Sequence, residues 1–246
     1  MSEEFADLKY RISEAIQEFL FKTVDRRAAG PVTVVQVGAN DGNMNDPVNL
    51  WVKSRHWRGV FVEPVDHFFK LLQKSYEGHD GLQFFQVACG STASVAPFFQ
   101  IRNPDEVPFP WMLGLSSFNQ DVIRRHFASD QEFELYVEKV EVKITRLDDL
   151  LDIAEIAVLD ILVIDTEGSE LSVLDGIDLK KRAPSIVMVE HHHLSWTEKE
   201  ELQQRLYELG YTRITGLFDT YFVKFGFLER VELDLLSLVS QGHLSK

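Results

Sequence analysis

The spacing of apolar residues changes along the chain and predicts two kinds of element. Near the amino terminus, apolar residues recur with a helical period, which predicts an amphipathic helix within residues 1–30. After residue 31, short β-branched runs alternate with helical patterns. This alternation is typical of an α/β fold with a mainly parallel sheet and helices on both faces. We therefore expect a helical segment at 1–30 and a single domain at 31–246.

The expected strands are short, and several are apolar enough to be buried on both faces. They cover residues 32–37, 59–63, 82–87, 95–101, 137–144, 160–164, 185–189, 211–215 and 221–225. The last two are expected to pair like a hairpin and close the sheet. Residues 92–145 interrupt the alternation, which predicts an insertion that carries specificity. Ser195 and Glu198 fit a capping box and predict the start of a helix.

Composition narrows the class of partner. The 246 residues include 25 basic and 39 acidic side chains, a formal net charge of −14. Nucleic-acid binding needs a surplus of Lys and Arg, and an acidic protein is poorly attracted to anionic lipid. The chain has no signal-peptide pattern, no apolar run long enough to span a membrane, and one cysteine, Cys89. We expect a cytoplasmic protein with no nucleic-acid or membrane partner.

A glycine-containing loop follows the first apolar strand. The segment VVQVGANDG, residues 34–42, ends that strand and turns at Gly38 and Gly42. The next strand ends in Glu63, and a carboxylate there can accept hydrogen bonds from both ribose hydroxyls of a nucleoside. Ligands of open α/β sheets bind beyond the carboxyl ends of the strands. The combination predicts a nucleoside-containing cofactor.

The loop does not suit a phosphate-bearing cofactor. It lacks the GxGxxG pattern of dinucleotide-binding folds, and GxxxxGK[ST] is absent from the chain. A pyrophosphate would also meet the carboxylates of Asp41 and Asp46. The sulfonium and ammonium groups of S-adenosylmethionine would be attracted to the same carboxylates. The charge pattern therefore favours S-adenosylmethionine over NAD or ATP.

Four segments together resemble one enzyme family. The segments VGANDG at 37–42, FVEP at 61–64, ILVIDTEGSELSVLDG at 161–176 and PSIVMVEHHHL at 184–194 are similar to the FkbM family of S-adenosylmethionine-dependent methyltransferases. The resemblance runs from about residue 32 to residue 211. It implies a class I methyltransferase fold, Rossmann-like and with seven strands. It also implies methyl transfer to oxygen, typically a hydroxyl of a sugar, polyketide or other small metabolite.

The resemblance also implies which residues bind the cofactor. The implied cofactor-binding residues are Gly38, Asn40, Asp41, Gly42, Glu63 and, after the third strand and beside the adenine, Ala88.

Acidic and histidine residues follow two later strands of the expected sheet. Asp165 follows the strand at 160–164, and Glu190 and His191 follow the strand at 185–189. Adjacent parallel strands would bring these ends to one rim, where a methyl acceptor must lie. Methyl transfer to oxygen often needs a base that takes the hydroxyl proton. We therefore expect Asp165, Glu190 and His191 to be catalytic.

A divalent cation is an alternative aid to the same chemistry. Mg²⁺ or Mn²⁺ held by Asp165 and Glu190 would orient the acceptor and lower its pKa. Successive residues of an extended chain point to opposite sides, so we expect His191 and His193 on one side and His192 on the other.

The acceptor is expected to contact the insertion. The expected acceptor-binding residues are Trp111, Ser116 and His126 from the insertion, together with His193. Core packing of the loop around Trp111 is an equally good interpretation of its apolar residues. The N-terminal helix either covers the sheet or contacts a second subunit in a homodimer.

Two other functions stay open at this point. A metal-dependent hydrolase built on Asp165, Glu190 and His191 would leave the loop at Gly38 and the acid at Glu63 unexplained. A noncatalytic protein on the same scaffold would bind the cofactor without turnover. An NAD-dependent dehydrogenase is disfavoured because the glycine pattern is wrong.

Overall fold

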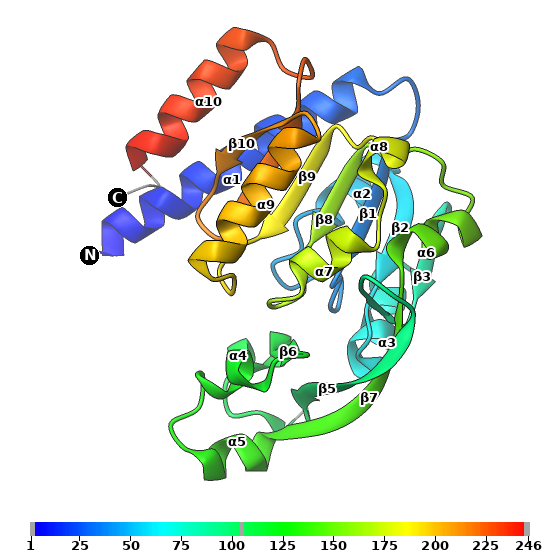
Figure 1. Cartoon of the computed structure of the whole chain (residues 1–246), viewed down its shortest axis with the longest axis vertical. Coiled ribbons are helices and arrows are strands. Elements are labelled where there is room, and N and C mark those ends of the chain that lie inside the picture. Colours follow the sequence, from blue (N-terminus) through cyan, green and yellow to red (C-terminus); the bar gives the residue numbers. More distant parts are fainter. Residues whose placement is uncertain (1–2, 104–105, 244–246) are drawn as a thin grey trace.

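The apolar runs of the sequence form a central seven-stranded sheet with the order β10-β11-β9-β8-β1-β2-β3, as the computed structural model in Figure 1 shows for residues 3–103 and 106–243. Its strands are β1 (Thr33–Val37), β2 (Arg58–Val62), β3 (Leu82–Phe85), β8 (Ile161–Ile164), β9 (Ile186–Glu190), β10 (Tyr211–Thr215) and β11 (Asp219–Lys224). The five strands from β9 to β3 are parallel, and β11 and β10 add an antiparallel edge. The expected mainly parallel sheet is confirmed.

Helices cover both faces of this sheet, because β1, β8 and β9 are apolar and buried along their whole length. One face is covered by α1 (Glu3–Arg27), α2 (Asn49–Arg55), α3 (Asp66–Ser75) and α10 (Arg230–His243). The other face is covered by α6 (Leu147–Ile153), α7 (Glu170–Asp175), α8 (Leu179–Arg182) and α9 (Trp196–Glu208). The capping box of Ser195 and Glu198 is present at the start of α9, as expected.

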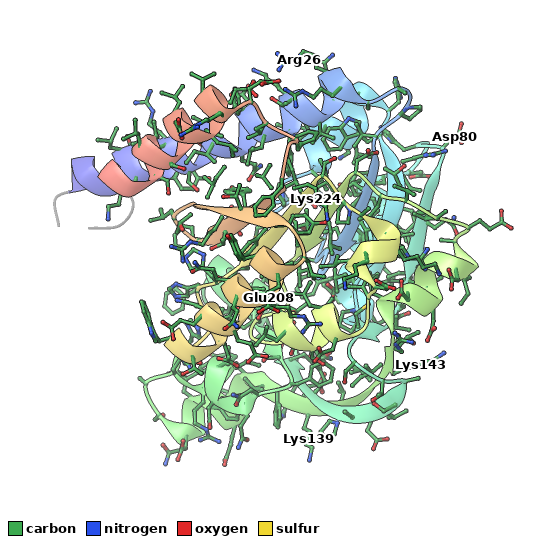
Figure 2. The ribbon with its side chains drawn as sticks, turned by 45° about the horizontal axis from the view of Figure 1, so that its top comes forward. Arg26, Asp80, Lys139, Lys143, Glu208 and Lys224 are labelled. Atoms are coloured by element: carbon green, nitrogen blue, oxygen red, sulfur yellow. The ribbon has the colours of Figure 1, made fainter. Side chains whose placement is uncertain are left out.

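The N-terminal helix α1 packs on its own sheet. Its apolar residues Ile16, Leu20 and Phe21 are buried in the same core as β1, β8 and α10, and Figure 2 shows α1 and α10 lying along each other. Leu8, by contrast, is 43% exposed. These three buried side chains are covered by their own chain, so the homodimer expected through α1 would have to use other residues and stays a prediction.

Residues 92–145 build most of a second, smaller sheet below the strand ends of the first (Figure 1). Its strands, in the order β4-β7-β5-β6, are β4 (Ala88–Cys89), β7 (Val137–Thr145), β5 (Ser94–Ile101) and β6 (Ser116–Ser117). The helices α4 (Gln120–Arg124) and α5 (Asp130–Tyr136) and the 3-10 helix Pro110–Gly114 complete the segment. Met112, Ile123 and Phe133 form a separate small core there. The Ser117 Oγ donates to the Glu167 carbonyl at 2.8 Å, which ties the segment to the main sheet.

None of the described helices is both long enough and apolar enough to cross a membrane.

Candidate active site

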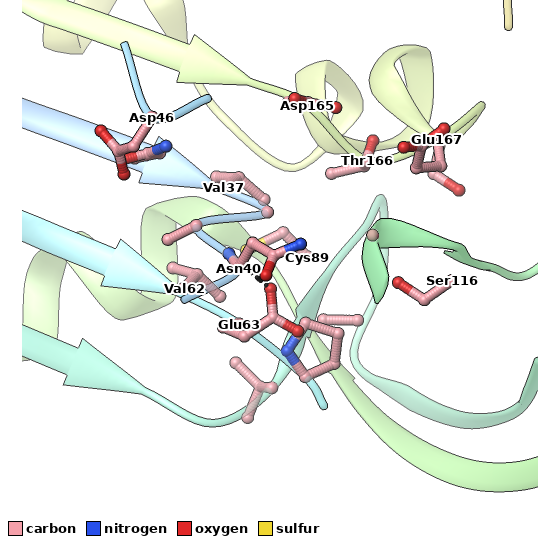
Figure 3. A pocket seen from close by; sticks show the side chains of 18 of the residues that line it. Val37, Asn40, Asp46, Val62, Glu63, Cys89, Ser116, Asp165, Thr166 and Glu167 are labelled. Atoms are coloured by element: carbon pink, nitrogen blue, oxygen red, sulfur yellow. Dashed lines mark hydrogen bonds between the residues drawn. The ribbon is translucent and has the colours of Figure 1, made fainter. Parts of the chain in front are cut away.

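The carboxyl ends of three neighbouring strands meet at one rim of the sheet. Val37, the last residue of β1, is in register with Val62 of β2 on one side and with Ile164 of β8 on the other. The next residues along the chain are Gly38, Glu63 and Asp165. Figure 3 shows the consequence: Asn40, Glu63 and Asp165 lie around the same space.

Glu63 holds the glycine loop against the end of β2. Its carboxylate accepts hydrogen bonds from the backbone N–H of Asn40 at 2.9 Å and of Val65 at 2.8 Å. The side chain is only 4% exposed, and burial raises the pKa of Glu63 to about 7. Asn40 has a positive φ of 47°, so the loop turns sharply where Glu63 binds it. Position 63 therefore shapes the loop as well as facing the cavity.

A cavity of about 940 Å³, counted to its open mouth, lies beyond these strand ends. We call it the glycine-loop cavity. Of the expected cofactor residues, those that line it are Gly38, Asn40, Glu63 and Ala88. Apolar walls come from Val62, Phe98 and Phe118.

Asp41 and Gly42 do not line this cavity. The Asp41 carboxylate instead accepts from the backbone N–H of Asn43 and of Met44, which closes a tight turn. A Cβ at Gly42 would lie 2.8 Å from Leu72. Both residues are therefore placed where they stabilise the loop, and the sequence could not separate that role from ligand contact.

The titratable Asp, Glu, Lys, Arg and His residues among the described lining of the glycine-loop cavity are all acidic. Its acidic lining residues are Asp46, Glu63, Asp165 and Glu167, and the described lining residues include no Lys, Arg or His. Asp46, expected from the sequence to repel a pyrophosphate and to attract a cationic cofactor, lines the cavity directly. Its carboxylate accepts from the backbone N–H of Val48 and Asn49, and burial raises the pKa of Asp46 to about 6. A phosphate group would find no cation here.

The loop after β8 is braced from within. Glu170 is fully buried, and its carboxylate accepts from the backbone N–H and the hydroxyl of Thr166 and from the backbone N–H of Gly168. Glu167 between them has a positive φ of 54°. The conspicuous DTEGSE segment thus combines two tasks: Glu170 fixes the loop, and the loop presents Asp165 and Glu167.

Asp165, directly after β8, is solvent-accessible and lines the glycine-loop cavity. No described residue donates a hydrogen bond to its carboxylate. Burial, followed by the nearby carboxylates of Glu167 and Glu190, raises the pKa of Asp165 well above its usual range. A carboxylate in this setting binds a proton strongly, as a general base must.

A second cavity adjoins the first, and we call it the acidic cavity. The two cavities share Asn45, Asp46, Pro47, Asp165 and Glu167 as lining residues. On its far side Glu190, the last residue of β9, is in register with Asp219, the first residue of β11. Burial raises the pKa of Glu190 to about 8 and that of Asp219 to about 7. Asp219 was missed because the sequence pattern suggested a strand beginning only at Tyr221.

The three consecutive histidines are not arranged as expected. His192 and His193 line the acidic cavity, whereas His191 lines neither cavity and its Nδ1 lies 3.1 Å from the Thr220 hydroxyl. Burial lowers the pKa of His191 to about 4. His193 is paired with Glu167 at 2.6 Å, and this hydrogen bond raises the pKa of His193. The chain bends after Glu190, so strict alternation does not apply.

Only some of the insertion residues that were expected to bind the acceptor line one of the two cavities. Ser116 lines the glycine-loop cavity. The ring of His126 lies 6.0 Å from that of His193, but His126 lines neither cavity. The side chain of Trp111 lies outside the described residues, so its expected contact with the acceptor stays a prediction.

The expected metal site has no support in the geometry. Among the residues that the structure describes, no group of three or more His, Cys, Asp or Glu side chains is arranged to hold a metal ion. His191 also points away from Asp165 and Glu190, so the trio required by the hydrolase alternative is not assembled.

The chain is similar to several solved methyltransferase structures. The crystal structure of Methyltransferase FkbM from Methylobacillus flagellatus KT has a TM-score of 0.50 and 17% identity, covering 78% of this chain and 43% of that one, so this chain spans less than half of that protein. A human methyltransferase 10 domain containing protein has a TM-score of 0.46 and 15% sequence identity, and the match covers 89% of this chain and 83% of that one. Human Methyltransferase-like protein 13 in complex with SAH has a TM-score of 0.41 and 9% sequence identity, and the match covers 100% of this chain and 94% of that one.

None of the curated protein sequences matches the chain significantly. The model of the Methyltransferase FkbM domain, however, matches residues 36–213, well over half of the sequence. The α/β methyltransferase fold expected from the sequence is thereby confirmed. The matched range contains the glycine loop, Glu63, Asp165 and Glu190, and the chain belongs to the FkbM methyltransferase family.

Proposed function

We propose that this chain binds S-adenosylmethionine in the glycine-loop cavity and methylates a hydroxyl group of a small acceptor. The observation that carries the proposal is the charge of that cavity, which is lined by four carboxylates and, among its described residues, by no Lys, Arg or His. NAD and ATP carry phosphates that such a cavity would repel. A cofactor with a sulfonium and an ammonium group is attracted to it.

The shape of the cavity supports the same cofactor. Each oxygen of the Glu63 carboxylate accepts one backbone hydrogen bond and keeps a lone pair for a ribose hydroxyl. The apolar side chains of Val62, Val87 and Phe98 provide walls suited to an adenine ring. Gly38 and Asn40 bring backbone to the cavity edge, where a ligand can approach closely.

Asp165 is the residue best suited to take the acceptor's proton. It lines both cavities, so an acceptor bound in the acidic cavity can place its hydroxyl beside Asp165 and toward the glycine-loop cavity. Bound in the glycine-loop cavity, S-adenosylmethionine would supply an electrophilic methyl group on its sulfonium; the acceptor oxygen would take that methyl group as the carbon–sulfur bond breaks, and the hydroxyl proton would leave. The ionised Asp165 carboxylate accepts that proton and returns it to water after product release.

Calorimetric titration with S-adenosylhomocysteine tests cofactor binding, with NAD and ATP as comparison ligands. We expect binding of S-adenosylhomocysteine alone, weakened at least about tenfold in Glu63→Gln, because one buried acceptor oxygen becomes a donor. Glu77→Gln, at an exposed position after α3, is the matched control and should bind like the wild type. Tight binding of NAD, or none of S-adenosylhomocysteine by a folded sample, would refute the proposal.

A further inference from the structure

The acidic cavity is a separate compartment completed by the N-terminal helix. Its walls include the ends of β8, β9 and β11, and on the opposite side the α1 residues Tyr10, Ser13, Glu14 and Gln17. The matched family domain begins at residue 36, so α1 lies before it. Part of the cavity next to Asp165 is therefore formed by an element outside the region that the family model describes.

Hydrogen bonds fix α1 in this position. The Ser13 hydroxyl accepts from the backbone N–H of Leu217 at 3.1 Å. The Gln17 side chain donates to the carbonyl of Pro47 at 3.2 Å and accepts from the Tyr221 hydroxyl at 3.4 Å. These contacts join α1 to the loop before α2 and to β11. The wall that α1 forms is therefore held in place by hydrogen bonds to the rest of the fold.

The acidic cavity carries a large excess of negative side chains. Its carboxylates are Glu14, Asp46, Asp165, Glu167, Glu190 and Asp219. Its basic residues, among those the structure describes, are His192 and His193. His193 is already paired with Glu167. The described lining contains no Lys or Arg that could pair with the remaining acids. A positively charged ligand group would therefore meet several carboxylates that have no basic partner.

Glu190 has a buried carboxylate oxygen that accepts no hydrogen bond from the described residues. The residue is 8% exposed, and its Oε1 accepts from the backbone N–H of His192. Its Oε2 is buried and has no hydrogen-bond partner among the described residues. A buried carboxylate oxygen without a donor is unusual in a folded protein, because the lost hydration is not replaced. A ligand that donates hydrogen bonds would satisfy it.

We propose that the acidic cavity binds a protonated amine of the methyl acceptor, between Glu190 and Asp219, with the acceptor's hydroxyl beside Asp165. The inference rests on the proposed function and adds a substrate class to it: hydroxylated small molecules that also carry an amine. An ammonium group offers three donors and one positive charge, which matches the unpartnered Glu190 oxygen and the facing Asp219 carboxylate. Anionic acceptors would be repelled by the same carboxylates.

Proton exchange should accompany this binding. Burial raises the pKa of Glu190 to about 8 and that of Asp219 to about 7, so near neutral pH Glu190 is mostly protonated and Asp219 partly so. The other titratable groups facing them are Glu14, Asp46, Asp165, Glu167, Glu170, His192 and His193. A bound cation favours the ionised carboxylates, so amine binding should release protons to the buffer.

Matched sets of small molecules test the substrate class. Each set has an amine, a neutral and an acidic member: ethanolamine, ethylene glycol and glycolate, then glucosamine, glucose and glucuronate, then tyramine, 4-ethylphenol and 4-hydroxyphenylacetate. Titrated into protein saturated with S-adenosylhomocysteine, the amine should bind at least about tenfold tighter than its partners in one set or more, with proton release. Equal affinities, tighter binding of an acidic member, or no binding of any amine would overturn the proposal.

Two pairs of variants assign the effect to the cavity. Glu190→Gln keeps an acceptor for the His192 N–H but removes the charge, and it should abolish the amine preference; Glu201→Gln, exposed on α9, is its control. Tyr10→Ala should weaken amine binding several-fold, whereas Leu8→Ala, on the same helix but away from the cavity, should not. An amine preference that survives Glu190→Gln would contradict the assignment.

Affinity for S-adenosylhomocysteine separates the two proposals. All four variants should bind it within about threefold of the wild type, because none of these residues lines the glycine-loop cavity. Loss of S-adenosylhomocysteine binding in the wild type would refute the proposed function itself. Normal cofactor binding without an amine preference would refute only the substrate class.

Discussion

Gly38 lies directly against the backbone of Asp165. A Cβ built on Gly38 would be 1.7 Å from the Asp165 carbonyl oxygen, and the Asp165 backbone N–H donates to Val37 at 3.0 Å. Although they are 127 positions apart in the sequence, Gly38 of the glycine loop and Asp165, the acid proposed to be catalytic, are therefore in contact through their main chains. The absence of a side chain at position 38 lets β1 and β8 end close enough to share one cavity.

Gly38→Ala should destabilise the protein much more than an alanine at another left-handed glycine position would. Gly78 has nearly the same φ, +82° against +81°, but a Cβ there meets nothing within 4 Å. Gly78→Ala should cost about 1–2 kcal/mol for its left-handed backbone. Gly38→Ala adds the clash with Asp165, and we expect about 4 kcal/mol or more. Urea unfolding measures both, and equal losses would show that the contact is unimportant.

Asp165→Asn should abolish turnover while preserving the cofactor site. The amide keeps the size of the side chain but cannot take the hydroxyl proton, so we expect kcat to fall at least about 100-fold. S-adenosylhomocysteine affinity should stay within about threefold. Asp149→Asn, exposed on α6, serves as the control. Wild-type turnover in Asp165→Asn would remove this residue from the mechanism.

The strongest sequence predictions concerned the strand ends. β1, β2 and β8 are short runs that are buried except for Arg58 at the start of β2, so their apolar residues had no competing interpretation, and the polar residue after β2 and after β8 had to lie at the rim. Glu63 and Asp165 were found in this way. Their positions follow from the parallel register of neighbouring strands, which short β-branched runs and intervening helices strongly favour.

Predictions of side-chain direction within loops were less successful. Asp41 faces its own turn because two nearby backbone N–H groups donate to its carboxylate. His191 faces Thr220 because its own N–H donates to the Phe218 carbonyl on the neighbouring chain segment. Asp219 joins the site through antiparallel pairing with Glu190. Such contacts depend on tertiary register, which a single sequence does not specify.

Glu170 should matter for stability and for the placement of Asp165. Glu170→Ala leaves three donors from Thr166 and Gly168 without their acceptor and opens a cavity at a fully buried position. We expect a loss of about 3 kcal/mol, a melting temperature lower by roughly 6–12 °C, and reduced kcat. Glu170→Gln keeps one acceptor oxygen and should lie between wild type and alanine. A melting temperature of Glu170→Ala equal to that of the wild type would contradict the role of Glu170 in holding the loop after β8.

The stability of the protein should fall as the pH rises through the neutral range. The pKa of Glu190 is about 8 in the folded protein, against an ordinary value of 4.5. Between those values the unfolded chain releases this proton and the folded chain keeps it, so stability decreases with pH and levels off above about 8. Glu63 and Asp219, with pKa values of about 7, act in the same direction.

Glu190→Gln isolates one part of that dependence. Glutamine cannot ionise, so the variant should match the wild type near pH 4, where both side chains are neutral, and melt a few degrees higher at pH 8. The groups surrounding Glu190 are Asp165, Glu167, Glu170, His192, His193 and Asp219. Most are acidic, so removing the charge relieves repulsion as well as desolvation. A constant difference in melting temperature between the two proteins at every pH would mean that the pKa of Glu190 is not raised. The folded protein would then have to supply a hydrogen-bond donor or a positive charge to the carboxylate at the end of β9.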